Sequence, residues 1–317
     1  MGDRLPSADV GTQRHVLDIW GGSTTGSGPW WGGSETGGGP YCVLLNTAEM
    51  KCWGFCLNYR CGWENSEEYS EWVSFRPKEV DGSMGDNLQA MKIPQGRTVI
   101  SMAISNHVLI LLDDHTMICF GKDYGGVCAT GIAVSTATRY TAIENAGRMV
   151  LPSNEQPVQI AAGPHVSLML MRSGKLAAVG TNALGSVGTE KSRTYGNLAS
   201  SVGNNISYVN LGDNIFIKSI SAQLSGGDAQ CAILSTNQLK CWGAGVYGQL
   251  GLSDTNPRGK TSNTMGSYLP VVNIGSIPLP TCAGAGQPPE CIDTRCDAGF
   301  ASNDAMQCVA CVAGTYK

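Results

Sequence analysis

Residues 229–251 read AQCAILSTNQLKCWGAGVYGQLG, and this stretch decides the fold. A short apolar run, Cys231 to Leu234, is followed by the polar turn 235–238 and by a second short run that ends at Trp242-Gly243. Two short apolar runs around a polar turn are typical of a β-hairpin. We therefore predict a hairpin here.

The same pattern occurs four times, in segments 41–62, 107–129, 165–188 and 229–251. Gly54, Gly121, Gly180 and Gly243 close the second apolar run of each segment, at spacings of 67, 59 and 63 residues. Further apolar stretches lie upstream, at 98–104, 157–163 and 215–220. Units of three to four short strands without a helical stretch bury their faces only by stacking, so the pattern predicts an all-β propeller.

A family resemblance supports this fold. Residues 241–251, CWGAGVYGQLG, closely resemble the repeat of the regulator-of-chromosome-condensation family, and its G-x-x-H element appears as Gly163-Pro164-His165. The resemblance covers roughly residues 15–272 and implies a β-propeller, which in that family typically has seven blades. Because only four units are clear, we expect a ring that closes with four or five blades, stays open, or is completed by another chain.

The repeats also divide the chain. We expect an N-terminal extension at 1–14, a β-propeller-like domain at 15–276, and a linker with a small cysteine-rich module at 277–317. The first residues, Met1 to Pro6, lack the apolar core of a signal peptide, so the chain is either cytosolic or has lost such a signal.

The cysteines decide between these compartments. Cys42 and Cys52 are ten residues apart at the same repeat positions as Cys231 and Cys241, and cross-strand neighbours about 5 Å apart suit a disulfide. The expected propeller disulfides are Cys42–Cys52, Cys231–Cys241, Cys119–Cys128 and Cys56–Cys61. Zinc at Cys52, Cys56 and Cys61 is the weaker alternative, because no histidine lies among them. Cysteine pairs in hairpins indicate an oxidising compartment.

The C-terminal stretch changes in composition. It carries Cys282, Cys291, Cys296, Cys308 and Cys311. Residues 308–317, CVACVAGTYK, resemble tumour-necrosis-factor-receptor-like and epidermal-growth-factor-like cysteine-rich modules. Five cysteines cannot all pair among themselves, so we expect either a module that continues beyond this sequence or a free or intermolecular thiol.

Several function classes are disfavoured. A net charge of −4 argues against nucleic-acid binding, and no apolar run is long enough to span a membrane. His107 and His165 occupy repeat positions that predict blade packing, whereas His115 is expected at a solvated turn. Neither a nucleophile elbow nor a phosphate-binding loop is present. We therefore predict no enzyme, no catalytic residue, no cofactor and no metal, and the exchange activity of the resembling family is not carried over because it is intracellular.

The leading hypothesis is an extracellular or cell-surface structural protein. Its propeller would be a rigid protein-protein interaction module in a surface fibre or filament, joined to itself or to other extracellular proteins. This architecture is similar to surface proteins of protists and algae, including mastigoneme proteins. The alternative is a recognition ectodomain that binds a ligand or glycan through Trp30, Trp31, Trp63 or Trp72. A sequon at Asn205 predicts N-glycosylation.

Overall fold

The structure is a computed structural model that describes residues 8–23, 38–54, 61, 84–132, 139–141, 143, 146–222, 228–275, 300–302 and 308–310. The chain divides into two compact units, 1–273 and 274–317. In the part of the chain that is described, no helix is both long and apolar enough to cross a membrane.

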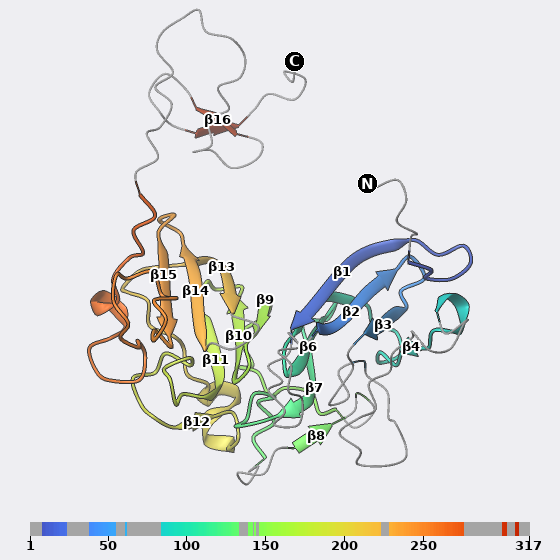
Figure 1. The fold of residues 1–317 in the computed structure, drawn as a ribbon, viewed down its shortest axis with the longest axis horizontal. Helices are drawn as coiled ribbons and strands as arrows, with labels where there is room; N and C mark the ends of the chain where they lie inside the picture. Colours follow the sequence, from blue (N-terminus) through green and yellow to red (C-terminus); the bar gives the residue numbers. More distant parts are fainter. Residues whose placement is uncertain are drawn as a thin grey trace, which may run out of the picture. The chain divides into compact units, whose positions relative to one another are not determined.

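The described residues of the first unit form four antiparallel sheets, each made of strands that follow one another in sequence (Figure 1). Blade 1 consists of β1 (Val16–Ser23), β2 (Gly38–Leu45), β3 (Met50–Gly54) and β4 (Ala90–Met91). Blade 2 consists of β5 (Val99–Ile104), β6 (His107–Leu112), β7 (Met117–Asp123) and β8 (Arg139–Thr141). Blade 3 consists of β9 (Pro157–Ala162), β10 (Val166–Met171), β11 (Leu176–Thr181) and β12 (Thr194–Tyr195). Blade 4 consists of β13 (Ile217–Ala222), β14 (Ala229–Leu234) and β15 (Leu239–Gly243). The predicted all-β meander units are thus present.

The remaining described elements are short. They include the 3-10 turns η4 (Gly85–Asn87), η6 (Ala199–Ser201), η7 (Gly203–Asn205) and η8 (Gly266–Tyr268). In the second unit, β16 (Phe300–Ser302) and β17 (Cys308–Ala310) form a two-stranded antiparallel sheet.

Each hairpin turns through one residue with a left-handed backbone. These residues are Ala48, His115, Gly174 and Asn237, with φ of 63°, 61°, 81° and 61°, six positions before the closing glycines. Each one donates its N–H to the carbonyl three residues earlier, at 2.8–2.9 Å. A left-handed residue is common in short hairpin loops, and glycine and asparagine adopt it readily, whereas alanine pays a steric penalty.

The closing glycines are required by backbone geometry. Gly243 has φ of 101°, and a Cβ there would lie 1.9 Å from the carbonyl oxygen of Asp228. Gly180 has φ of 126°, and its Cβ would lie 2.1 Å from the carbonyl oxygen of His165. Only glycine fits where the end of one strand approaches the start of its neighbour this closely, which explains why the repeat is marked by glycine.

Neighbouring blades bury their side chains against each other. Within a strand, successive side chains point to opposite faces of the sheet. The residue two before each closing glycine therefore points to the following blade, and the residue one before it points to the preceding blade. Cys119 of blade 2 packs with Val179 of blade 3, and Ala178 of blade 3 packs with Trp242 of blade 4. We call the side of a blade that packs on the next blade in sequence its following face, and the side that packs on the previous blade its preceding face.

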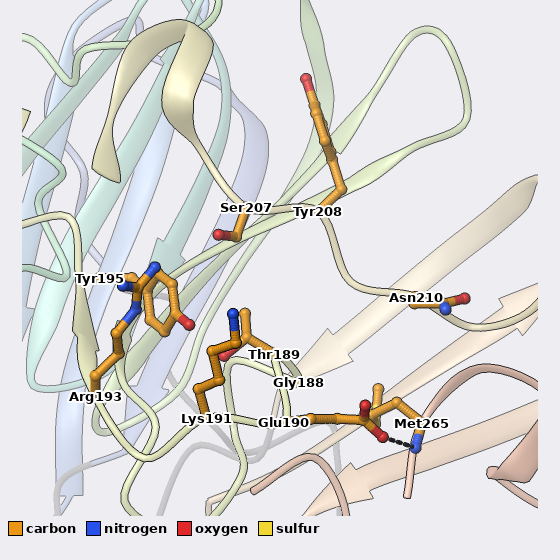
Figure 2. Close-up of a pocket in the computed structure, with 10 residues that line it drawn as sticks. All are labelled: Gly188, Thr189, Glu190, Lys191, Arg193, Tyr195, Ser207, Tyr208, Asn210 and Met265. Atoms are coloured by element: carbon orange, nitrogen blue, oxygen red, sulfur yellow. Dashed lines mark hydrogen bonds between the residues drawn. The ribbon is translucent and has the colours of Figure 1, made fainter. Parts of the chain in front are cut away.

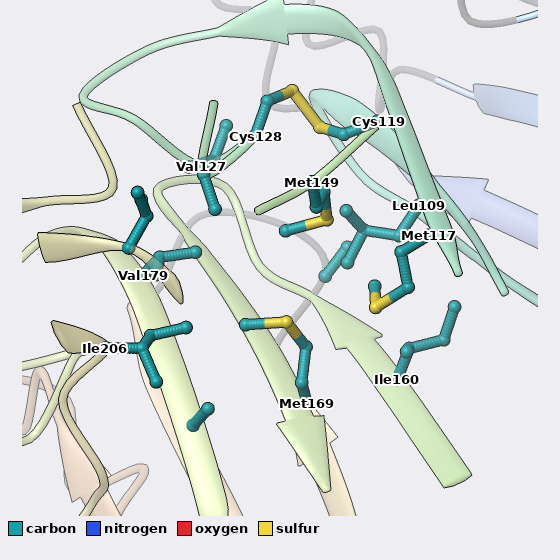
Figure 3. Close-up of a cluster of buried hydrophobic side chains, with 14 of the residues drawn as sticks. Leu109, Met117, Cys119, Val127, Cys128, Met149, Ile160, Met169, Val179 and Ile206 are labelled. Atoms are coloured by element: carbon teal, nitrogen blue, oxygen red, sulfur yellow. A yellow bond between two sulfur atoms is a disulfide. The ribbon is translucent and has the colours of Figure 1, made fainter. Parts of the chain in front are cut away.

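Three apolar cores result, one at each junction between consecutive blades. Figure 3 shows the core between blades 2 and 3, where Leu109 and Met117 of blade 2 lie opposite Ile160 and Met169 of blade 3. The loop after each closing glycine supplies one buried side chain, seven residues after that glycine; the first three of these lie in the cores between blades, and the fourth lies in a smaller cluster on blade 4. These side chains are Cys61, Cys128, Val187 and Leu250. The cores therefore fix blade against blade through repeat-equivalent positions.

Two buried lysines stand at equivalent repeat positions in blades 1 and 4. Lys240 donates to the carbonyl oxygens of Leu211 at 2.7 Å and Gly266 at 2.8 Å. Lys51 donates to the carbonyl oxygen of Gly85 at 2.6 Å. Burial lowers the pKa of both ammonium groups. Each lysine thus ties the 3-10 turn beside its blade to the second half of the hairpin.

The segment before β1 packs on blade 1. Arg14 forms an ion pair with Glu49 at 2.9 Å and another with Asp86 of η4. Thr12 donates its hydroxyl to Asp86 at 2.6 Å. Residues 8–14, expected as an extension, therefore share polar contacts with the loops of the blade.

Candidate functional site

Three disulfides are present among the described residues, in blades 1, 2 and 4. Cys42–Cys52 and Cys231–Cys241 each join directly paired residues of a hairpin, with Cα atoms 4.1 Å apart. Cys119–Cys128 joins β7 to the loop that follows it, with Cα atoms 5.2 Å apart. In the chain-entropy account, each disulfide, by closing a loop of about ten residues, stabilises the folded chain by roughly 3 kcal/mol.

The other predicted cysteines lie at the limit of what is described. Cys61 is buried and disulfide-bonded, whereas its expected partner Cys56 lies outside the described residues. Cys282, Cys291, Cys296 and Cys311 lie outside as well, and Cys308 is described only as part of β17. Because Cys52 is bonded to Cys42, the zinc alternative loses its first ligand. No three metal-binding side chains gather within the described ranges.

The buried His107 forms a hydrogen bond with a serine, but the direction of this bond is wrong for activating the serine as a nucleophile. Its Nε2 lies 2.7 Å from the Ser167 hydroxyl, which itself donates to the carbonyl oxygen of Val127 at 2.7 Å. Since the serine proton is engaged, Nε2 is the donor and Nδ1 is left as a buried acceptor without a partner. Burial, with a smaller effect of His165, lowers the pKa of His107 to about 3. The pair therefore joins blade 2 to blade 3, in keeping with the predicted packing role.

His165 and His115 also connect blades. His165 Nδ1 lies 3.0 Å from the Asp228 carboxylate of blade 4, and its ring meets Tyr124 edge-on. His115, expected at a solvated turn, is half-buried: its Nδ1 lies 3.2 Å from the carbonyl oxygen of Pro157, and Arg172 donates to its Nε2 at 3.2 Å. All three histidines thus bridge consecutive blades.

A hollow of about 280 Å³ lies beside blades 3 and 4. Figure 2 shows Lys191 and Arg193 along one side of it and Ser207, Tyr208 and Asn210 along the other. Its lining is completed by Gly188, Thr189, Glu190, Tyr195 and Met265.

The polar groups of the hollow are held by nearby contacts. The Glu190 carboxylate accepts the N–H groups of Thr264 at 2.7 Å and Met265 at 2.9 Å. The Arg193 guanidinium lies over the Tyr195 ring, 4.5 Å from its centre. Because Glu190 is committed to backbone groups, the two exposed cations dominate the charge of the hollow.

Tyr208 forms a second wall of the hollow. The Lys175 ammonium lies 5.3 Å from the centre of its ring. Burial, and then the charge of Glu155, raise the pKa of the Tyr208 hydroxyl. Figure 2 shows the Tyr208 hydroxyl pointing away from Lys191 and Arg193, so these two cations are the donors that the hollow offers to an anionic or hydroxyl-rich ligand.

The sequence did not predict this hollow. Lys191, Arg193 and Tyr208 form no motif, and blade stacking alone brings them together. The tryptophans expected to bind a ligand, Trp30, Trp31, Trp63 and Trp72, lie outside the described residues. Asn205 ends η7 and is exposed, with its side chain donating to the carbonyl oxygen of Ala199 at 3.4 Å.

Comparison with known proteins identifies the fold. No model of a known protein family matches the sequence, and no curated protein matches it. Solved structures do match. The chain is similar to Prp20p from Saccharomyces cerevisiae, reported with its binding to Gsp1p and histones, with 19% identity over 78% of this chain and 50% of that one and a TM-score of 0.55. It is also similar to human WBSCR16, with 16% identity over 78% of this chain and 54% of that one and a TM-score of 0.53.

A third similar structure is that of Kap60 bound to yeast RCC1 (Prp20), with 20% identity over 73% of this chain and 48% of that one and a TM-score of 0.53. The chain therefore has the RCC1-like β-propeller fold. It spans about half the length of these solved structures.

Proposed function

We propose that this chain is an extracellular or cell-surface structural protein whose propeller blades form a rigid protein-protein interaction module. Its partners are itself or other extracellular proteins, in a surface fibre or filament. The observation that carries the proposal is the set of disulfides in blades 1, 2 and 4. Disulfides of this kind persist in oxidising compartments and are rare in the cytosol.

The interaction role has separate support. Prp20p, a protein of the same fold, is reported with its binding to Gsp1p and histones, and yeast RCC1 (Prp20) is reported bound to Kap60. A protein of this fold is thus reported with protein partners. In this chain, the three histidines described above serve contacts between blades, which fits a scaffold more closely than a reaction centre.

The test uses the native protein on intact cells of its source. A membrane-impermeant biotin reagent should label the chain, and alkylation followed by non-reducing peptide mapping should recover the linked peptides of Cys42–Cys52 and Cys231–Cys241. A chain that is labelled only after lysis, with free thiols at Cys42 and Cys52, would overturn the extracellular proposal. Electron microscopy of the native material, showing a filament, a ring or a monomer, tests the structural role.

The hollow beside blades 3 and 4 favours a second function, recognition of an acidic glycan. Lys191 and Arg193 supply the charge, and Tyr208 supplies an aromatic ring in the lining of the hollow. The Lys191→Ala/Arg193→Ala double variant should lose binding to sulfated or carboxylated glycans on an array. Lys218→Ala removes an exposed lysine of β13 that does not line the hollow and is the matched control. Equal binding by all three proteins would eliminate this function.

A further inference from the structure

The preceding face of blade 1 carries an apolar position that every other blade buries. Ile19 of β1 pairs with Val43 of β2. The same pairing position in blades 2, 3 and 4 is held by Met102, Ile160 and Ile220, so these residues are the repeat equivalents of Ile19. Met102, Ile160 and Ile220 are 4%, 6% and 6% exposed, whereas Ile19 is 58% exposed. The position is the same in the repeat, and no described blade packs on Ile19. Val43, on the same face, is 1% exposed, so the open part of this face lies around Ile19.

The aromatic pair beside Ile19 shows the same contrast. Tyr41 is 53% exposed, although its repeat equivalents Val108, Ser167 and Gln230 are fully buried. Its ring stacks on that of Trp53, with the ring centres 6.4 Å apart. Trp53 is half-buried and stands one residue before the closing glycine, as the fully buried Trp242 does in blade 4.

The following face of blade 4 is incomplete in the matching way. Ile233 is 44% exposed, whereas Leu111 and Leu170, its equivalents in blades 2 and 3, are 1% and 4% exposed. Cys231 beside it is half-buried. The outer part of this face is covered by Leu250, Leu252 and Val272, so the open part lies around Ile233 and the disulfide.

We propose that a second copy of this chain completes both faces, with blade 4 of one copy packed on blade 1 of the next, head to tail. The proposal rests on the proposed function and names the partner. The chain itself makes this kind of contact three times, between blades 1 and 2, 2 and 3, and 3 and 4. The two open faces are the two halves of that same contact.

A second copy fits better than an unrelated partner for a physical reason. The following face of blade 3 already buries Trp242 and Ile220 of blade 4, which hold the repeat positions of Trp53 and Ile19. The contact therefore extends an interface that the chain already builds, in the same register. A contact between two different faces of the same chain is heterologous, so it generates either a closed ring or an open filament.

The experiment compares the full chain with three single variants by sedimentation velocity over a range of concentrations. Ile19→Asp places a charge on the preceding face of blade 1, and Ile233→Asp places one on the following face of blade 4. Ile100→Asp is the matched control, because Ile100 is 47% exposed on β5, away from both open faces. Circular dichroism and disulfide mapping verify that each variant is folded.

We expect the wild type and Ile100→Asp to form particles larger than one chain as concentration rises. Ile19→Asp and Ile233→Asp should each raise the dissociation constant more than tenfold when measured alone. A mixture of these two variants should form a dimer and stop there, because one pair of intact faces remains between them. This rescue by mixing is specific for a head-to-tail contact.

Three results would overturn the inference. They are a wild type that stays monomeric at every concentration, association that neither variant weakens, and association that only one variant weakens, which indicates a contact between like faces. None of them decides the proposed extracellular function, because surface labelling of intact cells tests that function independently. A monomer that is labelled at the cell surface would leave the proposed function standing with another protein as the partner.

Discussion

Replacement of Trp242 by alanine tests whether contacts between blades hold the fold together. Trp242 is fully buried between blades 3 and 4, and its Nε1 donates to the carbonyl oxygen of Ser186 at 3.0 Å. Burial of about 150–250 Å² at about 25 cal/mol per Å² corresponds to roughly 4–6 kcal/mol as an upper estimate. Measured substitutions of buried tryptophan by alanine cost about 3–5 kcal/mol. We therefore expect Trp242→Ala to lower the free energy of unfolding by about 4 kcal/mol.

The assay is guanidinium unfolding followed by circular dichroism, at a concentration low enough to keep the chain monomeric. Trp53→Ala is the comparison, because Trp53 holds the same repeat position but is only half-buried. It should cost about 1 kcal/mol, since only part of the ring is removed from water. Trp242→Phe, which retains most of the ring, should fall between the two. Equal losses of unfolding free energy for Trp242→Ala and Trp53→Ala would refute the conclusion that a neighbouring blade covers Trp242 and leaves Trp53 partly open.

Three other substitutions test local features. Joint replacement of Cys231 and Cys241 by serine should lower the free energy of unfolding by roughly 3 kcal/mol, measured by denaturant titration, because it frees a loop of about ten residues in the unfolded chain. His107→Gln should flatten the pH dependence of stability. In the wild type, the folded pKa of His107 is about 3 and lies below the unfolded value, so stability should fall as pH drops from about 6.5 toward 3, by about 1.4 kcal/mol per pH unit at most. A wild type whose thermal midpoint stays constant over that range would contradict this expectation. Ala48→Gly should raise stability by about 1 kcal/mol in thermal denaturation, because φ at Ala48 is 63°, whereas a destabilised variant would show that the turn is not strained.

Short-range sequence patterns predicted the central hairpins of the blades but not strand β1. The apolar runs and closing glycines marked β2–β3, β6–β7, β10–β11 and β14–β15, because these signals lie within about ten residues. The strand β1 was not identified from its sequence, VLDIWGGS, which contains an aspartate and ends in two glycines and a serine. Its place was decided by pairing with β2 across 14 intervening residues, which no local pattern reports.

Buried charge was the second gap. A lysine in a strand is normally expected at the surface. Lys51 and Lys240 are nevertheless buried, because carbonyl oxygens from 3-10 turns about 30 residues away along the chain accept hydrogen bonds from their ammonium groups. The hollow with Lys191 and Arg193 was missed for the same reason, since its residues meet only after blades 3 and 4 have stacked.

The positions that bear most directly on function are those whose burial differs from that of their equivalents in the other blades. Identities of 16–20% with solved propellers establish the fold alone, and such folds serve unrelated functions. The four blades, however, provide an internal comparison in which the strand register is the same. Ile19, Tyr41 and Ile233 depart from the burial of their equivalents, and they do so only on the two faces that no further described blade covers. Ile19 and Ile233 keep the apolar character of their buried equivalents, so these two positions have the composition of an interface rather than of a solvated surface. The mixing experiment with Ile19→Asp and Ile233→Asp measures that distinction directly.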